Sequence, residues 1–105
     1  MRAAATESAL AFIRGTLPRG LCQVENLALV WGCDRRTVHR RLALEGASFT
    51  LLVEEERRQL AAAAIASDAP MGEIAPQLGF TSLSTFSRWY RHSFGRTPTA
   101  GRRGD

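Results

Sequence analysis

The segment from Asp34 to Leu42, DRRTVHRRL, concentrates side chains that hydrogen-bond to anions and to the edges of nucleobases. Four of its nine residues are arginines and one is a histidine, and only Val38 and Leu42 are apolar anchors. The guanidinium group is a planar fork of donors that suits bidentate pairing with a phosphate or with a guanine edge. The segment therefore points to a polyanionic partner.

Helical spacing divides this segment into an apolar back and a cationic front. If Val38 and Leu42 face inward, the outer face of the helix displays Arg35, Arg36, His39 and Arg40. A second segment, residues 82–94, repeats the arrangement with Phe86 and Tyr90 inward, together with part of Trp89. Its outward side chains are Ser84, Ser87, Arg88 and Arg91. A helix of this kind, preceded by a short helix and a turn, has the geometry that fits a DNA major groove.

A run of charge is more often a solvated helix face than a binding surface. Against that reading, Arg36 and Arg40 are like charges four residues apart, which costs helix stability, and no acidic residue between them offsets the cost. The order of helix, glycine, turn, capping residue, basic helix and closing glycine also occurs twice, at 23–46 and at 71–95. DNA binding is the favoured interpretation. A helical protein-interaction module whose basic faces meet acidic partners is the alternative.

The composition fits a small globular protein with an anionic partner. All 14 basic side chains are arginine, against 10 acidic residues, which gives a net charge of +4 over 105 residues. Residues 34–45 carry +2 (four Arg, two acids) and residues 82–105 carry +4 (five Arg, one acid), on either side of residues 46–81 at −3 (two Arg, five acids). The hydrophobic content of 45% can bury one modest core, as a single small domain or as two half-size lobes.

Other classes of site find little support in the sequence. His39, His92, Cys22 and Cys33 do not have the spacing of metal ligands, so we expect no metal. The chain has no glycine-rich phosphate loop, no evident pair of catalytic carboxylates and no Gly-x-Ser-x-Gly elbow, so we expect neither an enzyme nor a cofactor. No apolar run approaches the ~18 residues of a membrane span. We therefore expect no membrane partner. Cys22 and Cys33 are too few and too loosely spaced for a disulfide scaffold, so we expect a cytoplasmic protein in a reducing compartment.

Gly, Pro and capping residues divide the chain into short helices, which predicts an all-α fold. The first expected helix contains Leu10, Ile13 and Leu17 and is ended by residues 17–20. Three more are expected at 23–31, at 34–45 with Asp34 as the cap, and at 48–67, which is the longest. A short helix abbreviated or kinked by Pro76 follows, and the last is expected at 82–94 with Ser82 as the cap. The expected aromatic core residues are Trp31, Phe49, Phe80, Phe86, Trp89 and Phe94. Residues 99–105 are expected to form a tail.

Three stretches of the chain carry a family resemblance. LALVWGCDRRTVHRRLALEGASF, RRQLAAAAI and EIAPQLGFTSLSTFSRWYRHSFGRTP resemble the DNA-binding domain of the AraC/XylS family of bacterial transcription regulators. The resemblance extends from about Ala9 to Arg102. Its second half is the more specific, since Ile74-Ala75, Gly79-Phe80, Phe86-Ser87-Arg88, Phe94-Gly95 and Thr97-Pro98 stand in the family's order and spacing.

The resemblance implies about seven helices or fewer, arranged as two helix–turn–helix units, at 8–46 and 70–98, with the helix at 48–67 as linker and the tail at 99–105. Each unit would insert a recognition helix into one of two adjacent major-groove segments of double-stranded DNA. The linker of about 28 Å would suit groove segments ~34 Å apart. The residues implied to approach base edges are Arg36, His39 and Arg40 in the first unit and Leu83, Ser84, Ser87 and Arg88 in the second. Those implied to touch phosphates are Arg35, Arg41, Arg91 and Arg96.

This sequence departs from the family pattern at three positions. Leu83 stands where a polar side chain is frequent, so it would either contact a thymine methyl or contribute little to the recognition of bases. Gly101 stands where an aromatic residue is usual, and Pro76 interrupts the fifth helix. We therefore expect more base specificity in the first unit.

Two different reading helices in one chain predict an asymmetric operator, or direct repeats when two molecules bind. RNA polymerase is a further candidate partner. Family members usually carry a sensing or dimerisation domain, for which this chain has no room. The sequence is therefore expected to be a fragment of a longer regulator or a protein that consists of the DNA-binding domain alone.

Overall fold

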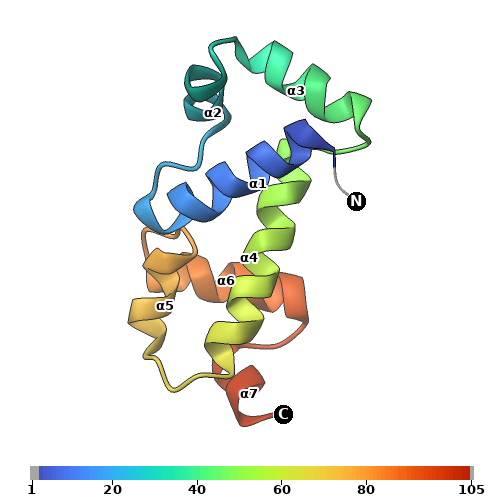
Figure 1. Ribbon diagram of the computed structural model, residues 1–105. Coiled ribbons are helices and arrows are strands. Elements are labelled where there is room, and N and C mark those ends of the chain that lie inside the picture. Colours follow the sequence, from blue (N-terminus) through green and yellow to red (C-terminus); the bar gives the residue numbers. More distant parts are fainter. Residues whose placement is uncertain (1–2, 105) are drawn as a thin grey trace. The chain divides into compact units, whose positions relative to one another are not determined.

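The computed structural model describes residues 3–104, which form seven α-helices and a 3-10 turn and contain no strand (Figure 1). The predicted all-α class is confirmed. The chain divides into two compact units, one ending at Glu56 and the other beginning at Arg57. The division falls within the longest helix, α4 (Phe49–Ile65). Of the two arrangements expected from the composition, the chain adopts the two half-size units.

The first unit contains α1 (Ala4–Thr16), the 3-10 turn (Leu17–Arg19), α2 (Val24–Trp31), α3 (Arg35–Leu44) and the first half of α4. Its core consists of the apolar faces that helical spacing predicts. The buried members are Ala9, Leu10, Ile13, Leu17, Leu27, Ala28, Val38, Leu42, Phe49, Leu52 and Val53. Helix α3 contributes only Val38 and Leu42 to this core; Thr37 is half-buried, and its other residues are exposed.

The second unit contains the remainder of α4 with α5 (Met71–Gln77), α6 (Leu83–Phe94) and α7 (Pro98–Arg103). Its core consists of Ala61, Ile65, Ile74, Ala75, Leu78, Phe86 and Tyr90. Phe80, Trp89 and Phe94 are partly buried and pack against this core, with ring centroids of Phe80 and Trp89 5.3 Å apart. The aromatic residues of this unit are thus packing residues, as predicted. Helix α5 is short, and Pro76 lies within it.

The predicted capping residues begin the two basic helices. The Asp34 carboxylate accepts a hydrogen bond from the Thr37 amide at 2.8 Å, and the Ser82 hydroxyl accepts one from the Thr85 amide at 3.2 Å. Each cap satisfies one of the amides that lack a partner in the first turn of a helix. Helix α6 ends at Phe94 and is followed by Gly95, whose φ of 76° is a conformation that favours glycine.

The expectation that residues 99–105 form a tail is wrong for the described part of that segment. Residues Pro98–Arg103 form α7, which begins where the Thr97 hydroxyl accepts a hydrogen bond from the Ala100 amide at 3.1 Å. Arg102 then donates from Nε to the Ile65 carbonyl and from an Nη to the Ala64 carbonyl, both at 3.1 Å. These bonds attach α7 to the C-terminal end of α4, where the Ala64 carbonyl also accepts from the amide and the hydroxyl of Ser67.

The departure at Gly101 also has a physical reason. A Cβ at this position would collide with the hydroxyl of Tyr90, a buried residue of α6. The second unit therefore places the Tyr90 ring where a side chain of residue 101 would otherwise lie. Glycine at 101 allows α7 and α6 to approach this closely.

Candidate nucleic-acid interface

The exposed face of α3 carries the three side chains expected to approach bases in the first unit. Arg36, His39 and Arg40 are all exposed, on the side of the helix opposite Val38 and Leu42. Both apolar residues are fully buried. The helix is therefore held by its apolar back while its cationic front remains accessible, as the spacing predicts.

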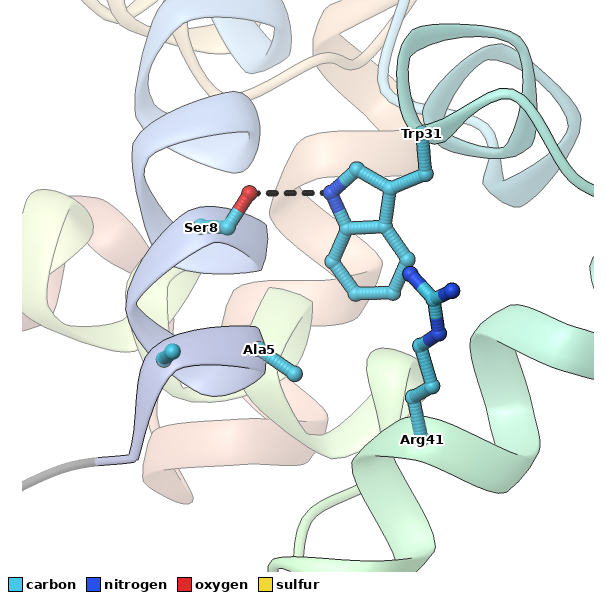
Figure 2. Close-up of a pocket in the computed structure, with 5 residues that line it drawn as sticks. Ala5, Ser8, Trp31 and Arg41 are labelled. Carbon is cyan, nitrogen blue, oxygen red and sulfur yellow. Dashed lines mark hydrogen bonds between the residues drawn. The ribbon is translucent and has the colours of Figure 1, made fainter.

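The two arginines expected at phosphates are held differently. Arg35 is exposed, and its guanidinium lies 3.3 Å from a carboxylate oxygen of Glu25 on α2. Arg41 is also exposed, but its guanidinium lies over the ring of Trp31, 5.7 Å from the ring centroid (Figure 2). The indole nitrogen of Trp31 donates to the hydroxyl of Ser8 at 2.9 Å. Sequence reasoning missed both partners, since neither is near its arginine in the chain.

The C-terminal end of α3 is attached to the start of α1 through Glu45. Its carboxylate accepts hydrogen bonds from the amide and hydroxyl of Thr6, at 2.8 and 2.6 Å, and from the Ala5 amide at 3.1 Å. The Thr6 hydroxyl is the main cause of a lowered pKa for the Glu45 carboxyl, with the Thr6 and Ala5 amides acting in the same direction. The contact fixes the end of the helix that carries the cationic front.

The exposed face of α6 is more mixed. Leu83, Ser84, Arg88 and Arg91 are exposed, and Ser87 is half-buried. Phe86 and Tyr90 are buried, as predicted from the spacing. Leu83 is 47% exposed and projects an apolar side chain from the first turn. Arg96, the fourth residue expected at a phosphate, is exposed between α6 and α7.

The two faces correspond position by position when residues 48 apart are paired. The caps Asp34 and Ser82 correspond, and each accepts from the amide of a threonine three residues later. In this register Arg36, His39 and Arg40 pair with Ser84, Ser87 and Arg88. One arginine is common to both faces, and the other positions differ in charge and size. The hydrogen bond from the Thr37 amide is the largest cause of the lowered pKa of Asp34.

The face of α3 ends on an apolar side chain that sequence reasoning did not single out. Leu44, one turn beyond Arg40, is 82% exposed. Residues four apart lie on the same side of a helix, so Leu44 extends the front that Arg36 and Arg40 begin. Its position four residues after Arg40 is the sequence signal that could have identified it.

Other kinds of site are not found in the part of the chain that the structure describes. Between residues 3 and 104, no three His, Cys, Asp or Glu side chains are grouped as metal ligands. Within the same range, every helix is too short or too polar to cross a bilayer. The exposed fronts of α3 and α6 each belong to a helix that is preceded by a short helix and a turn. This arrangement defines a helix–turn–helix protein.

Comparison with known proteins agrees with this class. A family model described as a helix-turn-helix domain matches residues 27–104. The chain is 37% identical over 94 residues to the HTH-type transcriptional regulator VirS of Mycobacterium tuberculosis, across 89% of this chain and 28% of VirS. It thus spans little more than a quarter of that relative. The chain belongs to the AraC-type helix–turn–helix family, the DNA-binding domain of AraC-family transcription regulators.

Two solved structures share the fold. The C-terminal domain of AraT, a response regulator from Geobacillus stearothermophilus, matches 98% of this chain and 87% of its own with a TM-score of 0.86 and 23% identity. A DNA-binding transcriptional dual regulator from Escherichia coli K-12 matches 99% of this chain and 100% of its own with a TM-score of 0.80 and 20% identity. At these identities the likeness concerns the fold.

Proposed function

We propose that this chain binds double-stranded DNA sequence-specifically, with α3 and α6 entering adjacent major-groove segments. The observation that supports the proposal best is the pair of capped helices, each with a buried apolar back and an exposed front of hydrogen-bonding side chains. A helix of about 10–12 Å diameter fits the ~12 Å width of the major groove. Membership of a DNA-binding family supports the same partner.

In the first unit, the side chains on the front of α3 would contact the base edges. Arg36 and Arg40 can each donate two hydrogen bonds to O6 and N7 of a guanine, and His39 can donate to a purine acceptor. All three are exposed. With two guanidinium groups and one imidazole on the same face, the first unit would contribute more to base specificity than the second unit.

In the second unit, base reading falls to Leu83, Ser84, Ser87 and Arg88. Arg88 corresponds to Arg40 and is the one guanidinium among them. The exposed Leu83 suits contact with a thymine methyl, and the two serine hydroxyls discriminate weakly because they both donate and accept. The second unit would therefore read fewer bases.

Phosphate contacts would position both helices. Arg35 and Arg41 flank the front of α3, while Arg91 and Arg96 lie toward the end of α6 and just beyond it. With about six phosphate contacts in all, the logarithm of affinity should fall with the logarithm of salt concentration at a slope near −5. A flat salt response would contradict an electrostatic contribution to binding.

The difference between the two fronts predicts an asymmetric operator, or direct repeats when two molecules bind. We infer further that the chain is the DNA-reading part of a bacterial transcription regulator. The similarity to VirS, an HTH-type transcriptional regulator, supports that role. RNA polymerase is a candidate partner in it.

Selection from a random duplex pool, followed by sequencing of the retained DNA, tests the proposal. The expected result is a motif with two unequal blocks, the stronger one lost on Arg40→Ala. No enrichment, or motifs with two-fold symmetry throughout, would contradict it. A gel shift that compares duplex DNA, single-stranded DNA and an acidic protein tests the alternative, in which Arg40→Ala leaves DNA binding unchanged.

A further inference from the structure

Trp31 joins three elements of the first unit. It is the last residue of α2, its indole nitrogen bonds to Ser8 of α1, and its ring lies beneath the guanidinium of Arg41 on α3 (Figure 2). The Trp31 side chain is half-buried, whereas Ser8 and Arg41 are exposed. Ala4, Ala5, Ser8, Trp31 and Arg41 line a shallow surface depression of about 310 Å³. The ring therefore orients a guanidinium at an accessible surface.

Arg35 provides a contrast on the same helix. Its guanidinium is paired with the carboxylate of Glu25, so a phosphate would have to compete with an existing negative charge. The aromatic ring beneath Arg41 attracts the cation through its quadrupole and carries no net charge. At 5.7 Å from the centroid, the guanidinium is within the range of that interaction. Trp31 thus orients Arg41 without neutralising it.

The position of Arg41 suits a phosphate better than a base. Successive residues of an α-helix are separated by about 100° around its axis, so Arg41 lies on the flank of α3 next to the front that Arg40 occupies. It extends over the Trp31 ring (Figure 2). Side chains on the flank of a helix seated in the groove reach the sugar–phosphate backbone, while the front faces the base edges.

We propose that Trp31 is a positioning residue that presets Arg41 for a backbone phosphate of DNA, with Ser8 fixing the ring. The inference rests on the proposed function, and it adds two residues that act through Arg41. An arginine held in one orientation before binding loses less conformational entropy when it meets its phosphate. Trp31 therefore strengthens binding to all duplex sequences alike.

A double-mutant cycle on a fixed duplex tests the proposal. Arg41→Ala should weaken binding to specific and random duplexes by the same factor and should lower the steepness of the salt dependence by about 0.9. Trp31→Leu should weaken binding about two- to fivefold in the presence of Arg41. In the Arg41→Ala background, Trp31→Leu should have no further effect. Equal losses in both backgrounds, or no loss with Arg41 present, would overturn the proposal.

Two further variants separate positioning from folding. Ser8→Ala removes the hydrogen bond to the ring from an exposed position, and its smaller loss of DNA affinity should also vanish in the Arg41→Ala background. The Ser8→Ala variant keeps the test decisive if the Trp31→Leu variant does not fold. If Ser8→Ala still lowers DNA affinity in the Arg41→Ala background, the positioning role is contradicted. The matched control is Arg35→Ala, whose effect should add to that of Trp31→Leu. If the wild-type chain binds no duplex, the proposed function itself fails.

Discussion

The carboxylate of Glu45 accepts hydrogen bonds from both the amide and the hydroxyl of Thr6, at 2.8 and 2.6 Å. The two residues are 39 positions apart in the chain, at opposite ends of the segment that forms α1, α2 and α3. A carboxylate near the first turn of a helix is favoured by the amides that point toward it. This contact ties the helix with the cationic front to α1.

The Glu45 contact predicts a dependence of stability on pH. The pKa of Glu45 is lowered in the folded chain, chiefly by the Thr6 hydroxyl. A lowered folded-state pKa gives stability that is present above the unfolded-state pKa and is lost as pH falls through the folded-state pKa. The Asp34 pKa, lowered chiefly by the Thr37 amide, acts in the same direction.

Glu45→Gln should accordingly flatten the acid limb of stability. Urea unfolding measured from about pH 5 down to about pH 2 should show a smaller decline in the free energy of unfolding than wild type shows. Thr6→Ala should reduce the decline as well, since it removes the main cause of the lowered pKa. An unchanged acid limb in Glu45→Gln would contradict the assignment.

Gly101→Ala should destabilise the second unit by about 1–3 kcal/mol, because the added Cβ collides with the Tyr90 hydroxyl. Tyr90→Phe removes that hydroxyl and should restore part of the loss in the double variant. Gly72→Ala is the matched control, since no atom lies within 4 Å of a Cβ built there and alanine favours a helix. Thermal unfolding distinguishes the three, and a Gly101→Ala variant as stable as wild type would refute the close approach.

Ser82→Ala should lower the free energy of unfolding by about 1 kcal/mol, because the Thr85 amide loses its acceptor at the start of α6. Ser82→Asp keeps an acceptor at that position and should retain most of the stability. Chemical denaturation of the three proteins provides the measurement. Equal losses in the alanine and aspartate variants would show that the cap is not the cause.

Arg40→Ala and Arg88→Ala compare corresponding positions of the two fronts. Under the proposed function, Arg40→Ala should weaken specific binding by about 1–3 kcal/mol and remove the base preference at one block of the operator. Arg88→Ala should remove preference at the other block and cost less, because the second unit is proposed to contact fewer bases. Titrations of each variant with operators altered in one block provide the measurement. Loss of preference at both blocks in either variant would contradict separate reading by the two helices.

The sequence allowed the all-α class and the orientation of both basic helices to be predicted. Val38 with Leu42, and Phe86 with Tyr90, are spaced four apart, and the burial of these pairs decides which sides of α3 and α6 remain exposed. The caps were predictable for a similar reason, since each residue acts on an amide three positions away. Features that depend on local spacing were thus accessible.

The contacts that hold these helices in place were not predicted. Glu45 meets Thr6 across 39 residues, Trp31 meets Ser8 across 23, and Arg102 reaches Ile65 across 37. Each forms only once separate helices have packed, and no periodicity marks it. The helix α7 was missed because its six residues are too few to show an apolar stripe, although Thr97-Pro98 is a capping signal.

Each unit contains a single tryptophan: Trp31 lies in the first and Trp89, against Phe80, in the second. Intrinsic fluorescence can consequently be assigned to one half of the chain at a time. In the Trp89→Phe variant the emission comes from Trp31 and reports on the surroundings of Arg41. In the Trp31→Phe variant it comes from Trp89 and reports on the packing of that ring against Phe80. Stopped-flow mixing of such single-fluorophore variants with an oligonucleotide would give the order in which the two halves engage their ligand.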